Sequence, residues 1–71
     1  MPVITVQMLS GRTAAQKSDF IQQVAEVAMR TLDVPERAIT IVLNEVPPES
    51  WGAGSKTMAA LRSKPPGALA T

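Results

Sequence analysis

The chain has 71 residues, a net charge of +1 and interspersed basic and acidic groups, which excludes the clustered basic surface expected of a nucleic-acid or anionic-membrane binder. It has no cysteine and no histidine, so it forms no disulfide and lacks the usual ligands of a transition metal. No apolar run approaches the roughly 20 residues that span a bilayer, and the first residues do not have the pattern of a signal peptide. We therefore expect a small cytoplasmic domain that depends on self-association for stability.

The first twelve residues place a proline directly behind the initiator methionine. Pro2 is small enough for Met1 to be removed, and removal would leave Pro2 with a free secondary amine. An ordinary N-terminal amine titrates at about 7.7–8.0, and burial or a nearby positive charge would bring it toward neutral pH, where a general base works best. Many proteins begin with Met-Pro for no catalytic reason, so this dipeptide alone makes Pro2 a candidate and nothing more.

The next residues predict a strand and then a long helix. Residues 3–9 alternate apolar side chains on both faces, so we expect a strand that is covered on both sides and ends at Ser10-Gly11. Thr13 and Gln16 have the spacing of a capping box, which predicts a helix from about Ala14 to Leu32 with a single apolar stripe.

A second strand is predicted over residues 39–46, after Pro35 has ended the helix and before Pro47-Pro48 stops the strand. Strand, helix and strand form a βαβ unit, in which the two strands are parallel and the crossover is right-handed. Two strands and one helix leave an open sheet edge, and open edges favour pairing with another chain.

The remaining residues predict a short projecting element and a tail. Trp51-Gly52-Ala53-Gly54 indicates a tight turn or hairpin. On it, Trp51 is expected to be a subunit-interface anchor or the wall of a pocket between subunits, and the two roles are compatible. Residues 56–62 are compatible with a helical turn or a frayed strand. We expect an α/β (α+β) domain over residues 1–62 and a flexible tail over 63–71.

Taken together, these features resemble the 4-oxalocrotonate tautomerase family, the short-chain branch of the tautomerase superfamily. The resemblance extends without a gap from Met1 to about Arg62. It rests on Met1-Pro2, Leu9-Ser10-Gly11-Arg12, Thr13 with Gln16-Lys17, Leu32-Asp33-Val34-Pro35, and the run from Glu45 to Gly54. It implies the tautomerase or MIF-like fold, in which a single βαβ unit with a short C-terminal hairpin assembles into dimers and then into a homohexamer, a trimer of dimers.

The resemblance also implies an activity and roles for three residues. Pro2, freed of Met1, would be the catalytic base that moves a proton in an enol or dienol acid to give the ketone. Arg12 would bind the carboxylate of this small substrate from a neighbouring subunit, and Trp51 would keep the site apolar and lower the pKa of the proline. No metal, nucleotide or other cofactor is implied. The alternative for Arg12 is a solvated arginine near a helix start, where the helix dipole disfavours a cation.

The sequence departs from the family pattern at two positions. Thr40 stands where the best-known tautomerases carry a second arginine, and Arg37 lies three residues earlier. Loss of a preorganised cation at a developing oxyanion typically costs on the order of 10²–10³ in rate, so Arg12 alone favours a monoacid substrate or a weak tautomerase. Ser55 replaces a glycine expected after Gly54, which predicts a hairpin of different shape.

Two rival functions are compatible with the same residues. One is a proline-dependent hydratase or dehalogenase acting on a 3-haloacrylate-like acid, although the sequence shows no obvious extra carboxylate to position water. The other is a non-catalytic subunit of a hetero-oligomer, which Thr40 supports. Glu45 and Glu49 are not expected to act as an acid–base pair, because most charged side chains are solvated or lie at interfaces.

Overall fold

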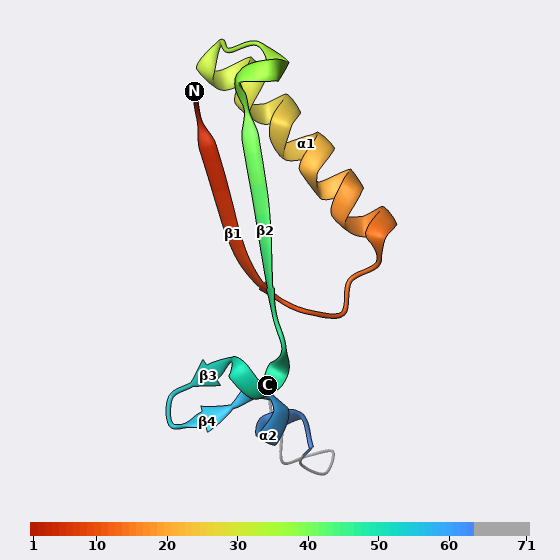
Figure 1. Ribbon diagram of the computed structural model, residues 1–71, viewed down its shortest axis with the longest axis vertical. Coiled ribbons are helices and arrows are strands. Elements are labelled where there is room, and N and C mark those ends of the chain that lie inside the picture. The colour runs from red at the N-terminus through yellow and green to blue at the C-terminus, as the bar shows by residue number, and fades with distance from the viewer. Residues whose placement is uncertain (64–71) are drawn as a thin grey trace.

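The computed structural model describes residues 1–63 and shows a βαβ unit followed by a small C-terminal lobe (Figure 1). The βαβ unit consists of β1 (Val3–Leu9), α1 (Ala14–Leu32), the short 3-10 helix η1 (Glu36–Ala38) and β2 (Thr40–Val46). The lobe consists of the 3-10 helix η2 (Pro48–Ser50), β3 (Gly52–Ala53), β4 (Lys56–Thr57) and α2 (Met58–Arg62). This order confirms the expected α+β fold.

β1 and β2 pair in parallel over their whole length, from Val3 opposite Thr40 to Leu9 opposite Val46. Because side chains alternate along a strand, this register gives the sheet two distinct faces. The face toward α1 carries a row of half-buried apolar side chains from both strands, namely Ile4, Val6, Met8, Ile41 and Leu43. α1 runs along this face and connects the two strands, as expected of a parallel crossover (Figure 1).

The opposite face of the sheet is open in the single chain. Val3 is 64% exposed and Val42 is 40% exposed, and both belong to the row that points away from α1. The expectation that β1 is covered on both sides is therefore wrong for one chain, because a single helix can cover one face only. The same face also carries the polar Thr5, Gln7, Thr40 and Asn44, so it combines exposed apolar and polar side chains that are available for contact with another protein chain.

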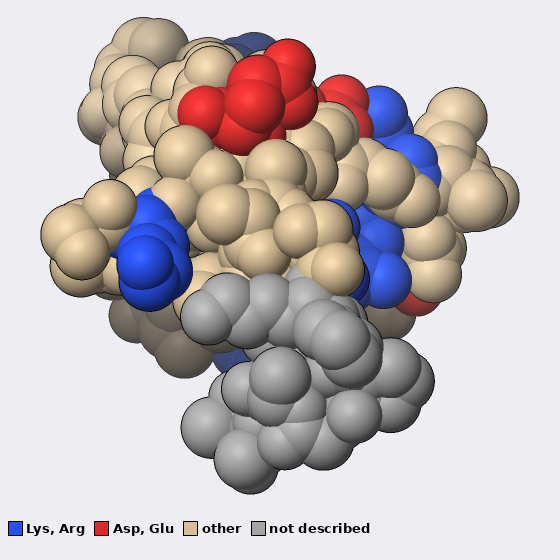
Figure 2. Space-filling view, turned by 90° about the horizontal axis from the view of Figure 1, so that it is seen from below, with Lys and Arg blue, Asp and Glu red and all other residues tan. Residues whose placement is uncertain are grey.

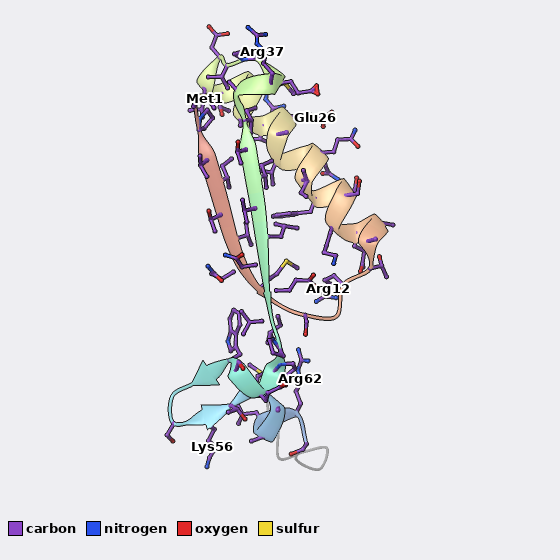
Figure 3. The ribbon with its side chains drawn as sticks, viewed as in Figure 1. Met1, Arg12, Glu26, Arg37, Lys56 and Arg62 are labelled. Carbon is purple, nitrogen blue, oxygen red and sulfur yellow. The ribbon has the colours of Figure 1, made fainter. Side chains whose placement is uncertain are left out.

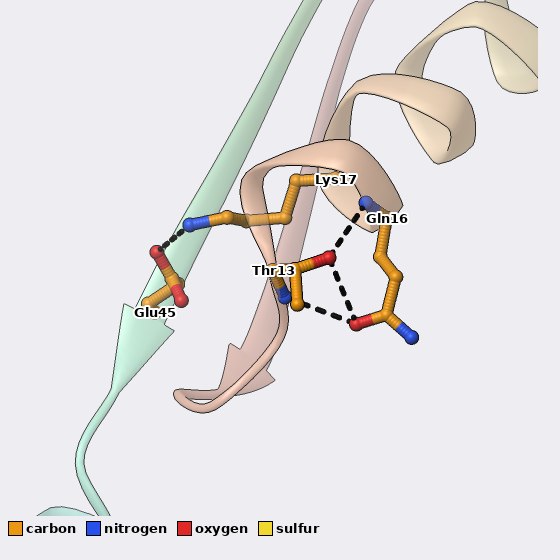
Figure 4. A network of polar contacts seen from close by, with 4 residues as sticks. All are labelled: Thr13, Gln16, Lys17 and Glu45. Atoms are coloured by element: carbon orange, nitrogen blue, oxygen red, sulfur yellow. Dashed lines mark hydrogen bonds and ion pairs between the residues drawn. The ribbon is translucent and has the colours of Figure 1, made fainter.

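α1 begins and ends with specific backbone signals. The Thr13 hydroxyl accepts a hydrogen bond from the Gln16 N–H at 3.1 Å, and the Gln16 side-chain oxygen accepts one from the Thr13 N–H at 3.0 Å (Figure 4). This reciprocal pair is the predicted capping box. At the other end, Asp33 adopts a left-handed conformation with φ of 55°, which ends the helix before Pro35 prevents its continuation.

The C-terminal lobe contains the expected hairpin. β3 and β4 pair antiparallel, with Ala53 opposite Lys56, so Gly54 and Ser55 form a two-residue loop. Gly54 has φ of +66°, whereas Ser55 has a negative φ, a combination that matches a type II′ turn with glycine at its first central position. The hairpin therefore closes with Ser55 in place of the glycine expected there.

A single chain encloses very little core. Within residues 1–63, Ala28 is the one buried hydrophobic residue, with 5% of its surface exposed, whereas Phe20, Val27 and Leu32 of α1 are 44–57% exposed. The radius of gyration is 16.2 Å, whereas a compact chain of this length has a radius of about 11 Å. The elongated shape follows from the C-terminal lobe, which lies beyond the end of the sheet and away from α1 (Figure 1).

The start of the second strand and the C-terminal residues differ in detail from their predicted bounds. The second strand begins at Thr40 and not at Ile39, because the Ile39 N–H closes η1 by donating to the Glu36 carbonyl at 3.1 Å. Residues 56–62 combine both alternatives, a short strand and then a helix. The expected tail lies outside the described residues apart from Ser63, which caps α2.

None of the helices in residues 1–63 has the length and apolar character that a bilayer crossing requires. The cytoplasmic location stays a prediction.

Replacement of Thr13 by alanine is expected to lower the free energy of unfolding by about 1 kcal/mol, because the Gln16 N–H loses its acceptor at the start of α1. The measurement is urea denaturation at a fixed protein concentration, since oligomer stability depends on concentration. Ser18→Ala is the matched control, because Ser18 is exposed inside the same helix and alanine is the better helix former. Equal losses in the two variants would contradict the role of the capping box.

Candidate active site

Pro2 lies at the N-terminal end of β1 and is held by the neighbouring strand. Its carbonyl accepts a hydrogen bond from the Thr40 N–H at 3.1 Å, and its side chain is half-buried. Met1 precedes it with 89% of its surface exposed. The backbone of Pro2 is thus fixed by the sheet, whereas the residue that would be removed makes little contact with the fold.

Thr40, which stands where the second family arginine is expected, is therefore the strand neighbour of Pro2. Arg37 lies one short turn earlier, in η1, and its side chain is exposed at the same end of the molecule as Met1 (Figure 3). The structure thus places a basic group at the Pro2 end of the same chain, and within residues 1–63 no hydrogen bond or salt bridge directs its side chain onto Pro2.

Arg12 lies at the other end of β1 (Figure 3). Seven strand residues at about 3.3 Å each separate the two ends by roughly 23 Å. Gly11 adopts φ of +123°, a conformation that other residues rarely take, and this turn carries the chain from β1 to Arg12 and the cap at Thr13. Arg12 and Pro2 of one chain therefore cannot act on the same small molecule.

Trp51 belongs to the same end as Arg12, because it follows η2 at the end of β2. It is half-buried, and its backbone is held on both sides. The Trp51 N–H donates to the Pro48 carbonyl at 3.4 Å, and the Trp51 carbonyl accepts from the Met58 N–H at 2.7 Å. These bonds attach Trp51 to the C-terminal lobe and not to the neighbourhood of Pro2.

A hollow of about 470 Å³ lies at this end of the molecule. Its lining combines the end of β1 with the following turn and with α2, through Met8, Leu9, Ser10, Gly11, Arg12 and Arg62. Arg62 is a basic lining residue that the sequence pattern did not single out. It falls in residues 56–62, where the periodicity was ambiguous, and the one available signal was a basic residue at the end of a possible helix.

A salt bridge fixes the start of α1 to the end of β2 beside this hollow. The Lys17 ammonium lies 2.7 Å from the Glu45 carboxylate, and both side chains are about one-third exposed (Figure 4). A partly exposed salt bridge of this kind contributes about 0–1 kcal/mol to the free energy of unfolding. Its main effects are to hold the Lys17 side chain against β2 and to neutralise the two charges. Glu45 is thus paired with a lysine, in agreement with the expectation that it is not half of an acid–base pair with Glu49.

The structure therefore brings Arg12 and Trp51 to one end of the subunit and leaves Pro2 at the other. A pocket that combines all three must take Pro2 from one copy and Arg12 from another, as the resemblance implied. The family model described as "Tautomerase enzyme" matches residues 2–61, beginning at Pro2. The chain belongs to the tautomerase family.

Relatives of this tautomerase family member agree in sequence and in fold. A 2-hydroxymuconate tautomerase of Stutzerimonas stutzeri is 31% identical over 61 residues, which cover 86% of this chain and 97% of the relative. The crystal structure of TomN, a 4-oxalocrotonate tautomerase homologue in the tomaymycin biosynthetic pathway, has a TM-score of 0.85 and 30% identity, covering 89% of this chain and 97% of TomN. These similarities confirm the resemblance to the 4-oxalocrotonate tautomerase family.

A third relative is informative about assembly. A heterohexamer 4-oxalocrotonate tautomerase from Chloroflexus aurantiacus has a TM-score of 0.80 and 34% identity, and the similarity covers 87% of this chain and 100% of that one. Tautomerases of this fold thus include a hexamer built from more than one kind of chain. Family membership supports a tautomerase-like, isomerase-type function for the present chain.

Proposed function

We propose that the chain is a 4-oxalocrotonate tautomerase-like keto–enol isomerase, which interconverts the enol or dienol and keto forms of a small carboxylic acid. The observation that carries the proposal is the family match from residue 2 onward, which makes Pro2 the first matched residue. The proposal requires the removal of Met1. Met1 is 89% exposed, so its removal takes little from the fold and leaves a free secondary amine on a strand whose position is fixed.

In this proposal Pro2 is the single acid–base group. Its neutral nitrogen removes the proton from the enol hydroxyl and returns it to a carbon of the substrate, which leaves the conjugated ketone and the regenerated amine. Arg12 of another copy holds the substrate carboxylate with a two-pronged hydrogen bond, which a lysine cannot reproduce. Trp51 limits access of water, and the interaction between the charges becomes stronger in the drier pocket.

Self-association is part of the proposal, because Pro2 and Arg12 of one chain are separated by the length of β1. Three surfaces are available for the contact: the open sheet face with Val3 and Val42, the strand edges, and the outer side of α1. The last of these carries a groove of about 430 Å³ bordered by Phe20 and Val27. We propose a homohexamer, in which these surfaces form the contacts between copies.

A second candidate function is favoured by one observation. Thr40 lies beside Pro2 where a cation is expected, and a heterohexamer relative exists in which different chains share one assembly. A non-catalytic subunit of a hetero-oligomer would keep the fold without an efficient site. The variants of Pro2 described next distinguish this candidate from the enzyme.

Replacement of Pro2 by alanine is expected to lower kcat/KM for ketonisation of 2-hydroxymuconate or phenylenolpyruvate by about 10²–10⁴, because the secondary amine acts as the general base. Intact mass must first show that Met1 is absent from the wild-type protein. Insertion of an alanine between Met1 and Pro2 is a second variant, which separates the effect of the proline ring from that of its free nitrogen. This variant keeps the proline ring but ties its nitrogen in a peptide bond, so it should lose as much activity. Wild-type rates in both variants would exclude proline catalysis.

Replacement of Arg12 by alanine is expected to lower kcat/KM by about 10- to 100-fold, since hydrogen bonds to a charged group contribute about 1.5–3 kcal/mol. Arg12→Lys should recover little of this loss, because the paired geometry is missing. Arg30→Ala is the control, because Arg30 is an exposed arginine in the last turn of α1. Steady-state kinetics in which the Arg12 and Arg30 variants behave alike would contradict a binding role for Arg12.

Replacement of Val42 by lysine is expected to shift the protein toward smaller species in sedimentation velocity, because it puts a charge in place of an exposed apolar side chain on the open face of the sheet. Val42→Ile, which keeps the face apolar, is the matched control and should sediment as the wild type does. A wild-type protein that sediments as a 7.5 kDa monomer would contradict the intersubunit site.

A further inference from the structure

The loop between β1 and α1, which carries Arg12, is attached on both sides to the end of β2. Before the loop, the Ser10 N–H donates a hydrogen bond to the Val46 carbonyl at 2.9 Å. After the loop, the Lys17 ammonium lies 2.7 Å from the Glu45 carboxylate (Figure 4). Glu45 and Val46 are consecutive residues of β2. The loop thus begins and ends against two adjacent residues of the same strand.

The side chain of Arg12 is not held in place by contacts of its own. It is exposed, and within residues 1–63 it takes part in no hydrogen bond and no salt bridge. Gly11, directly before it, has φ of +123° and no Cβ to restrict the backbone. The direction of the Arg12 guanidinium therefore depends on how the two ends of the loop are fixed.

The contact between Lys17 and Glu45 is the one polar side-chain link between α1 and the sheet in the described part of the chain. The other side-chain hydrogen bonds of α1 stay within the helix or its N-terminal cap. The rest of the contact is made by the apolar row of the sheet, and apolar contact has no preferred direction. The salt bridge is therefore the contact that sets where the first turn of α1 lies along β2.

The salt bridge is connected to Arg12 through a single hydrogen-bonded turn. The Lys17 N–H donates to the Thr13 carbonyl at 3.1 Å, and Thr13 and Gln16 form the reciprocal capping box. Arg12 directly precedes Thr13 in the chain. A shift of Lys17 relative to β2 thus moves the capped turn as a unit, and Arg12 moves with it.

The surface around this loop offers no broad electrostatic field that could replace the salt bridge. Seen from the end of the molecule that carries the C-terminal lobe, charged side chains of both signs form separate small patches between uncharged surface (Figure 2). A field that orients a group over a distance needs many charges of one sign. The position of the loop therefore depends on contacts between particular side chains.

The salt bridge is suited to positioning more than to stability. The side chains of Lys17 and Glu45 are 29% and 32% exposed, and partly exposed pairs contribute little to the free energy of unfolding. Loss of the pair leaves the fold intact but lowers the fraction of molecules in which the loop has its bound position. The apparent dissociation constant of a ligand rises as this fraction falls.

We infer that Lys17 is a positioning residue, which through its salt bridge with Glu45 holds the start of α1, and with it Arg12, in the position that binds the substrate carboxylate. The inference rests on the proposed tautomerase function and on the role of Arg12 in it. Lys17 contacts neither the substrate nor the transferred proton, which stays with Pro2.

The first test measures the kinetics of phenylenolpyruvate ketonisation. Lys17→Met, which keeps an unbranched side chain but removes the charge, is expected to raise KM by about threefold to fivefold with kcat unchanged, because a weak contact that positions a binding group is lost. Glu45→Gln should give the same rise, and Lys17→Arg, which can still pair with Glu45, should behave as the wild type does. Lys56→Met is the matched control, since it makes the same change at an exposed lysine of the C-terminal lobe.

A wild-type KM in Lys17→Met, or an equal rise in Lys56→Met, would overturn the inference and leave the tautomerase function in place. Sedimentation of each variant checks that the assembly is intact, so that a change in KM is not due to dissociation of the subunits.

The second test asks whether Lys17 acts through Arg12. In the Arg12→Ala background there is no guanidinium to position, so the further change Lys17→Met should alter kcat/KM by less than about 1.5-fold, whereas it lowers kcat/KM by about threefold to fivefold in the wild-type background. A purely structural effect of Lys17 would lower kcat/KM by the same factor in both backgrounds, and that result would contradict the positioning role.

A third test does not depend on catalysis. The Gln16 N–H, which donates to the Thr13 hydroxyl at 3.1 Å, reports on the turn that carries Arg12. Its hydrogen exchange in the Met1-free protein is expected to be about threefold to fivefold faster in Lys17→Met than in the wild type, with exchange at Ala28 in the same helix unchanged. Unchanged exchange at Gln16 would refute the inference even if the protein proved to have no tautomerase activity.

Discussion

The parallel pairing of β1 with β2 is the constraint on which the rest of the structure depends. Parallel strands must be connected by a crossover, and α1 supplies it, so both strands start at one end of the sheet and finish at the other. Pro2 and Thr40 therefore lie at the first end, and Arg12 and the C-terminal lobe lie at the second. Seven paired residues separate the two groups of side chains by about 23 Å, a distance that no side chain spans. Chemistry that needs both groups must be shared between chains.

The same arrangement explains why the single chain is poorly packed. One helix covers one face of a two-stranded sheet, so the other face, both strand edges and the outer side of α1 stay open. Ala28 is the one buried hydrophobic residue of the described chain, which is too little core to offset the entropy lost on folding. Stability and site assembly thus have a common requirement, since contacts that bury Val42 or Phe20 between copies are also the contacts that can bring the two ends of different chains together.

Charge is distributed unequally between the two ends. Beside Pro2 the strand neighbour is the uncharged Thr40, and the short helix η1 that precedes Thr40 carries the exposed Arg37. At the other end, Arg12 and Arg62 share a hollow in which no acidic residue takes part, while Lys17 is engaged by Glu45.

The amino-acid sequence by itself determined the local elements, the family and the candidate residues. Alternating apolar residues predicted β1, the Thr13–Gln16 spacing predicted the start of α1, and the pair Gly52 and Gly54 predicted the hairpin, because each depends on contacts between residues close in the chain. The separation of Pro2 from Arg12 already follows from the seven-residue strand predicted between them. The tertiary structure alone decided which face of the sheet stays open and that Arg62 lines the same hollow as Arg12. These facts depend on the strand register and on the packing of α2 beyond the end of β2. Such contacts join residues far apart in sequence, and no local pattern encodes them.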